Sequence, residues 1–381
     1  MAGVSLIELL IALLIGSLLI LGLVQVFGAS RTAYQTSEGL ARVQENARFA
    51  LDYLQRDLRM AGHFGCVNDQ AHFIVGEGDP VNRLGTATGP NQILDFSVSV
   101  QGYEATGTAP GDDVTLRAGA ATWVPALPAE IEGLNPELTA GSDIIVLRFF
   151  GARGTQVNGV TSAGVVTIPV ATGATTDGWE VLTDEGVGAP TMFGIADCSF
   201  ADVFPGSGGT GSVIATGSGA TALADRYTPS PQGQTSLYRA NVLVYYVAPG
   251  ASGLPSLYRA RANSGGTFDP GHIEELVEGV ESLQLIYGLD ETPDISQDSP
   301  PLGSISDYVT AATLGEDAAQ WRRVGVVRAG LVVGSPSPAA VQTADALDVM
   351  GVSFHPPSAN DTHYRAGYQA TVAVRNRLFG N

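Results

Sequence analysis

Lysine is absent from the 381-residue chain, so all 19 basic side chains are arginine. That absence excludes the phosphate-binding lysine of P-loop enzymes, Schiff-base chemistry and a lysine general base. Against 38 acidic residues, the formal net charge is −19. Such a surface repels nucleic-acid phosphates and anionic lipid headgroups, so the composition argues against a nucleic-acid partner.

Cysteine and histidine are also scarce, with two cysteines, Cys66 and Cys198, and five scattered histidines. A zinc site needs three or four such ligands at characteristic spacing, and the sequence does not supply them. Two distant cysteines in an exported chain pair more often than they stay as buried thiols, so we expect a Cys66–Cys198 disulfide. Closing this loop of roughly 130 residues would stabilise the fold by about 4–5 kcal/mol in the chain-entropy model.

Charge is nearly missing from one long segment near the N-terminus. From Val4 to Phe27 the sequence VSLIELLIALLIGSLLILGLVQVF holds a single charge, Glu8. As a helix it would extend about 36 Å, enough to cross a bilayer and too long for the apolar region of a signal peptide. We therefore predict a membrane-spanning helix over residues 4–27. The Glu8 carboxylate either lies near the interface at the helix start or awaits a positive partner, because an unpaired charge in an apolar span costs several kcal/mol.

Helical periodicity continues beyond Phe27 without a proline. The pattern places Asp57 among the polar faces, makes Gly39 a weak point or kink, and ends the helix near Gly62. A helix of this length, apolar and then amphipathic, suits packing on a sheet; a coiled-coil dimer is the alternative. The apolar positions, three or four residues apart, are Leu40, Val43, Ala47, Leu51, Leu54 and Leu58.

The segment Gly3-Val4-Ser5-Leu6-Ile7-Glu8-Leu9-Leu10 resembles the type IV prepilin motif. The resemblance implies cleavage after Gly3 by a prepilin peptidase and N-methylation of the new amino terminus at Val4. It also implies that Glu8 pairs with the N-terminal amine of a neighbouring subunit and so sets the register of a filament. Valine stands where the family usually has phenylalanine.

The leader, residues 1–3, carries no basic residue, whereas prepilin leaders usually do. We therefore expect a start upstream of Met1 or a trimmed leader. Arg31, Arg42 and Arg48 follow the apolar segment, so the positive-inside rule alone would place the C-terminal domain in the cytoplasm, which is the alternative topology.

Further segments resemble PilW-type minor pilins. The junction DLRMAGHFGC at residues 57–66, the segment LVEGVESLQLIYGLD at 276–290 and the ending YQATVAVRNR at 368–377 follow the order of that family. Residues 321–333, WRRV followed by VVRAGLVV, resemble the family's intervening strand. The resemblance covers about residues 3–66, 237–290 and 318–377, whereas residues 67–236 resemble no family.

The PilW resemblance implies a role in priming type IV pilus assembly and a place near the pilus tip. The implied partners are other minor pilins, the major pilin, the prepilin peptidase and, in many cases, a PilY-type adhesin. The implied localisation is the inner membrane, with a cytoplasmic N-terminus and a periplasmic C-terminal domain, and then the pilus at the cell surface.

The expected fold class is α+β and pilin-like: a long N-terminal membrane-spanning and amphipathic helix packed on a large antiparallel β-rich C-terminal domain. We expect the helix to continue over 28–62 and the domain to span 63–381 with an insertion at about 100–235. Short apolar runs bounded by turn residues predict strands at 143–150, 241–247 and 282–287. Residues 274–277 are expected to add one helical turn, and the glycine-rich runs 151–173 and 206–219 to form loops or hairpin tips.

Sequence signals for catalysis are missing. No G-x-S-x-G, H-E-x-x-H or G-x-G-x-x-G after a strand occurs, so we expect no cofactor and no enzyme activity. Asp290, Asp294 and Asp298 are weak calcium candidates, with a solvated acidic turn as the alternative. Two other hypotheses about the function stay open: the protein is a GspJ-like pseudopilin of type II secretion, or it is a single-pass membrane-anchored adhesin or hydrolase.

Overall fold

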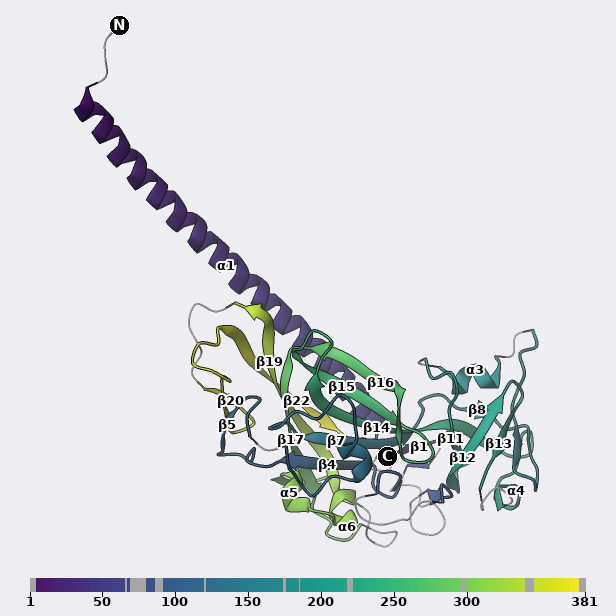
Figure 1. Ribbon diagram of the computed structural model, residues 1–381. Coiled ribbons are helices and arrows are strands. Elements are labelled where there is room, and N and C mark those ends of the chain that lie inside the picture. Colours follow the sequence, from purple (N-terminus) through teal and green to yellow (C-terminus); the bar gives the residue numbers. More distant parts are fainter. Residues whose placement is uncertain are drawn as a thin grey trace.

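One continuous helix and a large β-rich domain make up the protein (Figure 1). The computed structural model describes residues 5–65, 67–68, 80–85, 92–119, 121–173, 176–184, 186–217, 222–295, 299, 301–339 and 346–376. Helix α1 runs over Leu6–Met60, so it ends close to the predicted position. Gly62, with φ of 76°, then turns the chain into the domain, where its N–H donates to the carbonyl of Arg148.

The second half of α1 packs one face on the domain. Val43, Ala47, Leu54 and Leu58 are fully buried there, which confirms the predicted stripe at those positions. One expectation about this half was wrong, because Asp57 lies on the buried face and not among the polar ones. The helix continues through Gly39, where an added Cβ would overlap the Cβ of Ala339, so glycine at this position allows the helix to pack closely on the domain.

The central sheet is built around one long strand, β14 (Ser236–Pro249). Its second half lies between β7 (Ile144–Phe150) and β15 (Pro255–Ala262), and its first half pairs with β11 (Met192–Ala196). The strands expected near 143–150 and 241–247 are thus confirmed. The remaining strands of this sheet are β3 (Val81–Asn82), β4 (Val100–Ala105), β6 (Trp123–Val124), β8 (Thr155–Gln156), β9 (Gly159–Val160), β10 (Val165–Thr167), β12 (Ala201–Gly209), β13 (Ser212–Ala215) and β16 (Phe268–Glu278).

A second, four-stranded antiparallel sheet completes the surface on which α1 rests. Its order is β18 (Ile305–Val309), β17 (Val280–Asp290), β19 (Val324–Pro338) and β22 (His363–Ala373). Strand β17 confirms the strand expected at 282–287. The helical turn expected at 274–277 was wrong, because these residues pair with β15 in β16. A small sheet of β20 (Leu347–Val349), β21 (Val352–His355) and β5 (Asp113–Thr115) adjoins it.

The central sheet separates two cores because residues alternate between its faces. Leu243 and Tyr245 of β14 join the core beneath α1 and the four-stranded sheet. Val244 and Tyr246 of the same strand point into a second core that includes Phe64 and Phe96. The short elements outside these sheets are β1 (His63–Phe64), β2 (Val67–Asn68), α2 (Ala129–Glu132), α3 (Gly178–Leu182), α4 (Leu223–Arg226), α5 (Ala311–Leu314) and α6 (Ala318–Arg322).

The middle of the chain forms a side lobe with its own core, drawn in teal at the end of the domain far from the helix start (Figure 1). Buried residues of this core fall between Val157 and Leu237. Strands β4 and β7, which fall within the insertion expected at about 100–235, pair with each other in the central sheet, and the limits of that insertion stay a prediction. The glycine-rich run at 206–219 contributes to a hairpin of β12 and β13.

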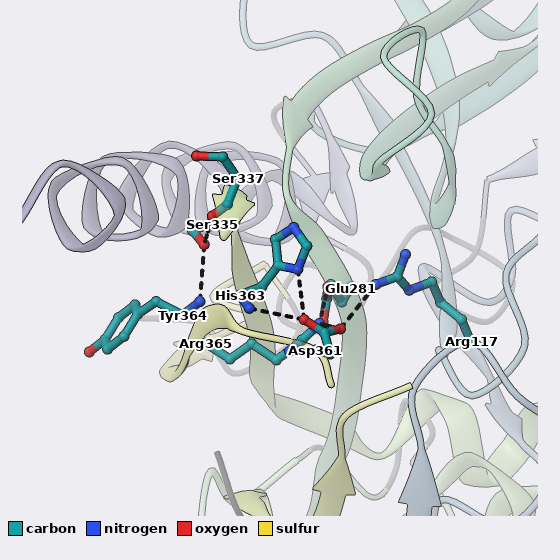
Figure 2. A network of polar contacts seen from close by, with 8 residues as sticks. All are labelled: Arg117, Glu281, Ser335, Ser337, Asp361, His363, Tyr364 and Arg365. Atoms are coloured by element: carbon teal, nitrogen blue, oxygen red, sulfur yellow. Dashed lines mark hydrogen bonds and ion pairs between the residues drawn. The ribbon is translucent and has the colours of Figure 1, made fainter. Parts of the chain in front are cut away.

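A buried polar network joins β17 to β22 (Figure 2). Arg365 donates to both oxygens of Glu281 and to Asp361, at 2.5–3.1 Å, and the three side chains are 4–7% exposed. Arg117, from the loop after β5, reaches the same carboxylates at 3.4 and 3.9 Å. The network balances two guanidinium groups with two carboxylates, as buried charges require.

Candidate functional site

The exposed half of α1 is the strongest candidate for a functional surface. Its large apolar side chains from Leu6 to Phe27 are 51–77% exposed, and this part of the helix extends away from the domain (Figure 1). A helix that is apolar all round is stable only when a membrane or other apolar helices cover it. By length and composition, α1 can cross a membrane.

Glu8 is the one charged residue in the described part of this half-helix before Arg31. It lies in the first turn of α1, is exposed, and accepts a hydrogen bond from the backbone N–H of Ser5 at 3.4 Å. An acidic group in the first turn interacts favourably with the helix dipole. The carboxylate thus remains accessible to a positive partner outside the chain. Gly3 and Val4, the predicted cleavage and methylation positions, lie outside the described residues.

The packed half of α1 is fastened to the sheet by an ion pair at Asp57. Its carboxylate accepts from the Tyr245 hydroxyl at 2.5 Å and from Nη1 of Arg259 at 3.0 Å. Burial, together with the adjacent Asp57 charge, raises the pKa of Tyr245, so the hydroxyl remains a donor. Arg259 also reaches Glu274 at 2.8 Å. Sequence reasoning missed this contact, although a charge three residues after Leu54 on an otherwise apolar stripe was the available signal.

The chain's C-terminal segment closes the end of α1. The side-chain amide of Asn376 lies 3.0–3.4 Å from the carbonyl oxygens of Arg59, Met60 and Ala61, to which it donates. The last carbonyls of a helix lack intrahelical partners, so a side-chain donor there stabilises its end. The resemblance at 368–377 included Asn376 but did not reveal this contact, which joins residues more than 300 apart in sequence.

Of the two cysteines in the predicted disulfide, the structure describes Cys198 alone. Cys66 lies outside the described residues, and Cys198 is not a free cysteine. Their chain neighbours do come together, since a Cβ built on Gly65 would lie 2.9 Å from the Cβ of Ala196. The Cys66–Cys198 pairing stays a prediction.

The weak calcium candidates are not brought together as a site. Asp290 is 1% exposed, and its carboxylate accepts backbone N–H groups of Thr292, Leu302 and Gly303. Burial alone would raise the pKa of Asp290, but these hydrogen bonds lower it. Asp294 is exposed, and Asp298 lies outside the described residues. Within the described ranges, no three His, Cys, Asp or Glu side chains form a group suited to a metal ion.

Of the comparisons with known proteins, the match to a family model agrees with the motifs. A solved type IV-like pilin from Thermus thermophilus aligns over 88% of this chain and 98% of its own, at 10% identity and a TM-score of 0.31, which is too low to support an argument. No curated protein matches the sequence. Residues 244–376, from β14 to the Asn376 contact, match the family model PilW, described as Type IV Pilus-assembly protein W. The resemblance to PilW-type proteins of type IV pilus assembly is thereby confirmed over residues 244–376.

Proposed function

We propose that this protein is a minor pilin that takes part in initiating type IV pilus assembly and lies near the pilus tip. One observation carries the proposal: a single continuous helix is apolar and uncovered in its first half, and in its second half packs on a domain that includes the PilW match. An anchor alone would not need to continue as a rigid helix into the domain core. The role is assembly, and no catalytic step is part of it.

The uncovered half-helix supplies the contact area for assembly. In the membrane it is surrounded by lipid, and in a filament it packs against the corresponding helices of neighbours. Cleavage after Gly3 would free the amine of Val4 for N-methylation. The exposed Glu8 carboxylate of one subunit then pairs with the amine of another, and because both are desolvated in a helical core, the pair selects one axial register.

The chain would enter the inner membrane with its N-terminus in the cytoplasm and its β-rich domain in the periplasm. Its partners would be the prepilin peptidase, other minor pilins, the major pilin and a PilY-type adhesin at the tip. The β-rich domain, including the side lobe, offers the surfaces for lateral contacts with these components.

The first test is mass spectrometry of the N-terminal peptide, from membranes and from sheared surface filaments. A peptide that begins at N-methylated Val4, present in the sheared fraction, supports the proposal. A peptide that retains Met1 would leave a membrane anchor, and restriction of the processed protein to membranes would favour a secretion pseudopilin.

The second test compares Glu8→Ala with Glu38→Ala, since both residues are exposed acidic positions on the same helix. We expect Glu8→Ala to insert and fold normally but to reduce surface pili, while Glu38→Ala leaves their number unchanged. Normal pilus numbers in Glu8→Ala would contradict the register role.

A further inference from the structure

A pocket at the edge of the central sheet combines an aromatic wall with two acidic side chains. Its volume is about 360 Å³, which lies within the range of about 300–1,000 Å³ that is typical of pockets for organic ligands. Strand β6, the last strand at this end of the sheet, contributes Trp123. Leu127, Glu132, Glu137 and Leu138 line the pocket from the chain that runs through and beyond α2. Among the residues that the structure describes, none from α1 lines it.

The aromatic wall is fixed in place by the fold. Nε1 of Trp123 donates to the carbonyl oxygen of Ser142 at 2.9 Å, and the half-buried indole packs against the second core. Leu127 is half-buried and Leu138 is 8% exposed, so both add apolar surface to the pocket. The aromatic and apolar surfaces are therefore positioned before any ligand binds, which lowers the entropy cost of binding.

The two acidic side chains have no positive partner within the chain. Glu132 and Glu137 are exposed, and in the described part of the protein neither carboxylate takes part in an ion pair or a hydrogen bond. The buried Glu281, by contrast, is paired with Arg365. Two uncompensated negative charges beside apolar surface favour a ligand that carries a positive charge on an apolar stem.

The lining of the pocket distinguishes between classes of cation. Calcium takes about six to eight oxygen ligands, which two carboxylates beside an indole and two leucines do not supply. A guanidinium group stacks on aromatic faces and forms bidentate hydrogen bonds with carboxylates. The methylenes of an arginine side chain also cover apolar surface. An arginine side chain therefore matches the indole, the carboxylates and the leucines together.

We propose that this pocket binds an arginine side chain presented by a partner protein. The guanidinium group stacks on Trp123 and pairs with the carboxylates of Glu132 and Glu137, while the methylene stem lies on Leu127 and Leu138. The proposal goes beyond the proposed function, because it assigns a partner chemistry to the β-rich domain and not to α1. Binding at the pocket and assembly through α1 can therefore succeed or fail independently.

The test uses the full chain in non-ionic detergent, labelled with fluorotryptophan, and follows the tryptophan resonances by fluorine NMR. The chain has three tryptophans, so Trp123→Phe identifies the resonance of Trp123, and those of Trp179 and Trp321 serve as internal references. The probes are a blocked pentapeptide with one arginine among glycines, the same peptide with neutral citrulline, and guanidinium chloride.

We expect the arginine peptide to shift the Trp123 resonance, with an affinity that falls as ionic strength rises to about 0.15 M, and the citrulline peptide not to shift it. No shift at Trp123, or an equal shift with citrulline, would overturn the proposal. Equal affinities for the guanidinium ion and the peptide would also overturn it, because the apolar stem would then contribute nothing.

The matched variants are Glu132→Gln/Glu137→Gln and the control Glu130→Gln/Glu316→Gln. The control removes the same charge from two exposed residues that lie near Tyr103, on the strand that pairs with β6, and that do not line the pocket. We expect the first variant to bind the arginine peptide at least about fivefold more weakly, because it loses charge-assisted contacts, and the control to bind within about twofold of the wild type. Equal weakening in both would indicate general attraction to an acidic surface and would overturn the proposal. Circular dichroism checks that both variants fold, and the citrulline comparison tests the proposal on the wild type without any variant.

Discussion

The ion pair at Asp57 makes a quantitative prediction about how α1 is held on the domain. Asp57→Asn keeps the size of the side chain but removes its charge, so Arg259, whose side chain is 12% exposed, loses its buried partner. Removing one member of a buried pair costs about 3–5 kcal/mol. Two effects reduce that loss: Arg259 keeps Glu274 at 2.8 Å, and a negative charge near a helix C-terminus is itself unfavourable by about 0.3–1 kcal/mol. We therefore expect a loss of about 2–3 kcal/mol.

The assay is urea unfolding of the full chain in non-ionic detergent, followed by tryptophan fluorescence. Trp321 is 1% exposed and belongs to the core beneath α1, so its emission reports the loss of that core. The control is Asp52→Asn, because the Arg48–Asp52 pair is exposed and should contribute no more than about 0.5 kcal/mol.

A double-mutant cycle isolates the pair itself. If Asp57 acts through Arg259, then Asp57→Asn in an Arg259→Gln background should cost at least about 1 kcal/mol less than in the wild type. A loss for Asp57→Asn no larger than that for Asp52→Asn, or full additivity in the cycle, would refute this reasoning.

Three further predictions concern the same scaffold. Gly39→Ala should lower the free energy of unfolding by about 1–2 kcal/mol, because the cost of the overlap with Ala339 exceeds the ~1 kcal/mol gain in helix propensity. The control Gly28→Ala should not be destabilising, because its added Cβ meets nothing within 4 Å. Urea unfolding of both variants checks this. Asn376→Ala should cost about 1 kcal/mol in the same assay, because it leaves the end of α1 without its side-chain donor. Burial alone would raise the pKa of Asp361, but its hydrogen bonds with Arg365 and His363 hold that pKa well below the usual value. The stabilisation by this carboxylate is therefore present above about pH 4 and is lost as the pH falls. Asp361→Asn should flatten the decline in unfolding free energy below about pH 4, and an unchanged slope would contradict this.

Local sequence patterns were sufficient to predict the helices and strands whose apolar residues follow a regular spacing. The uninterrupted apolar run after Val4 and the three- and four-residue spacing from Val43 to Leu58 predicted one long helix, and the structure has one from Leu6 to Met60. The apolar runs at 143–150 and 241–247 predicted strands that the central sheet contains. These patterns are predictive because the spacing of apolar residues along the chain reflects whether one face or both faces of a helix or strand are buried.

What the sequence by itself determined is therefore the long helix, its uncovered apolar half, the β-rich class of the domain and the resemblance to PilW-type proteins. The tertiary structure alone decided which charges are buried. Arg148, in an apolar strand, is fully buried because its guanidinium group donates to the carbonyls of Ile93 and Val98 at 2.8 Å. Asp57 meets Tyr245 and Arg259 across about 200 residues of chain, and no local pattern encodes such partners. The physical reason is that a buried charge is tolerated only where distant segments supply its hydrogen bonds.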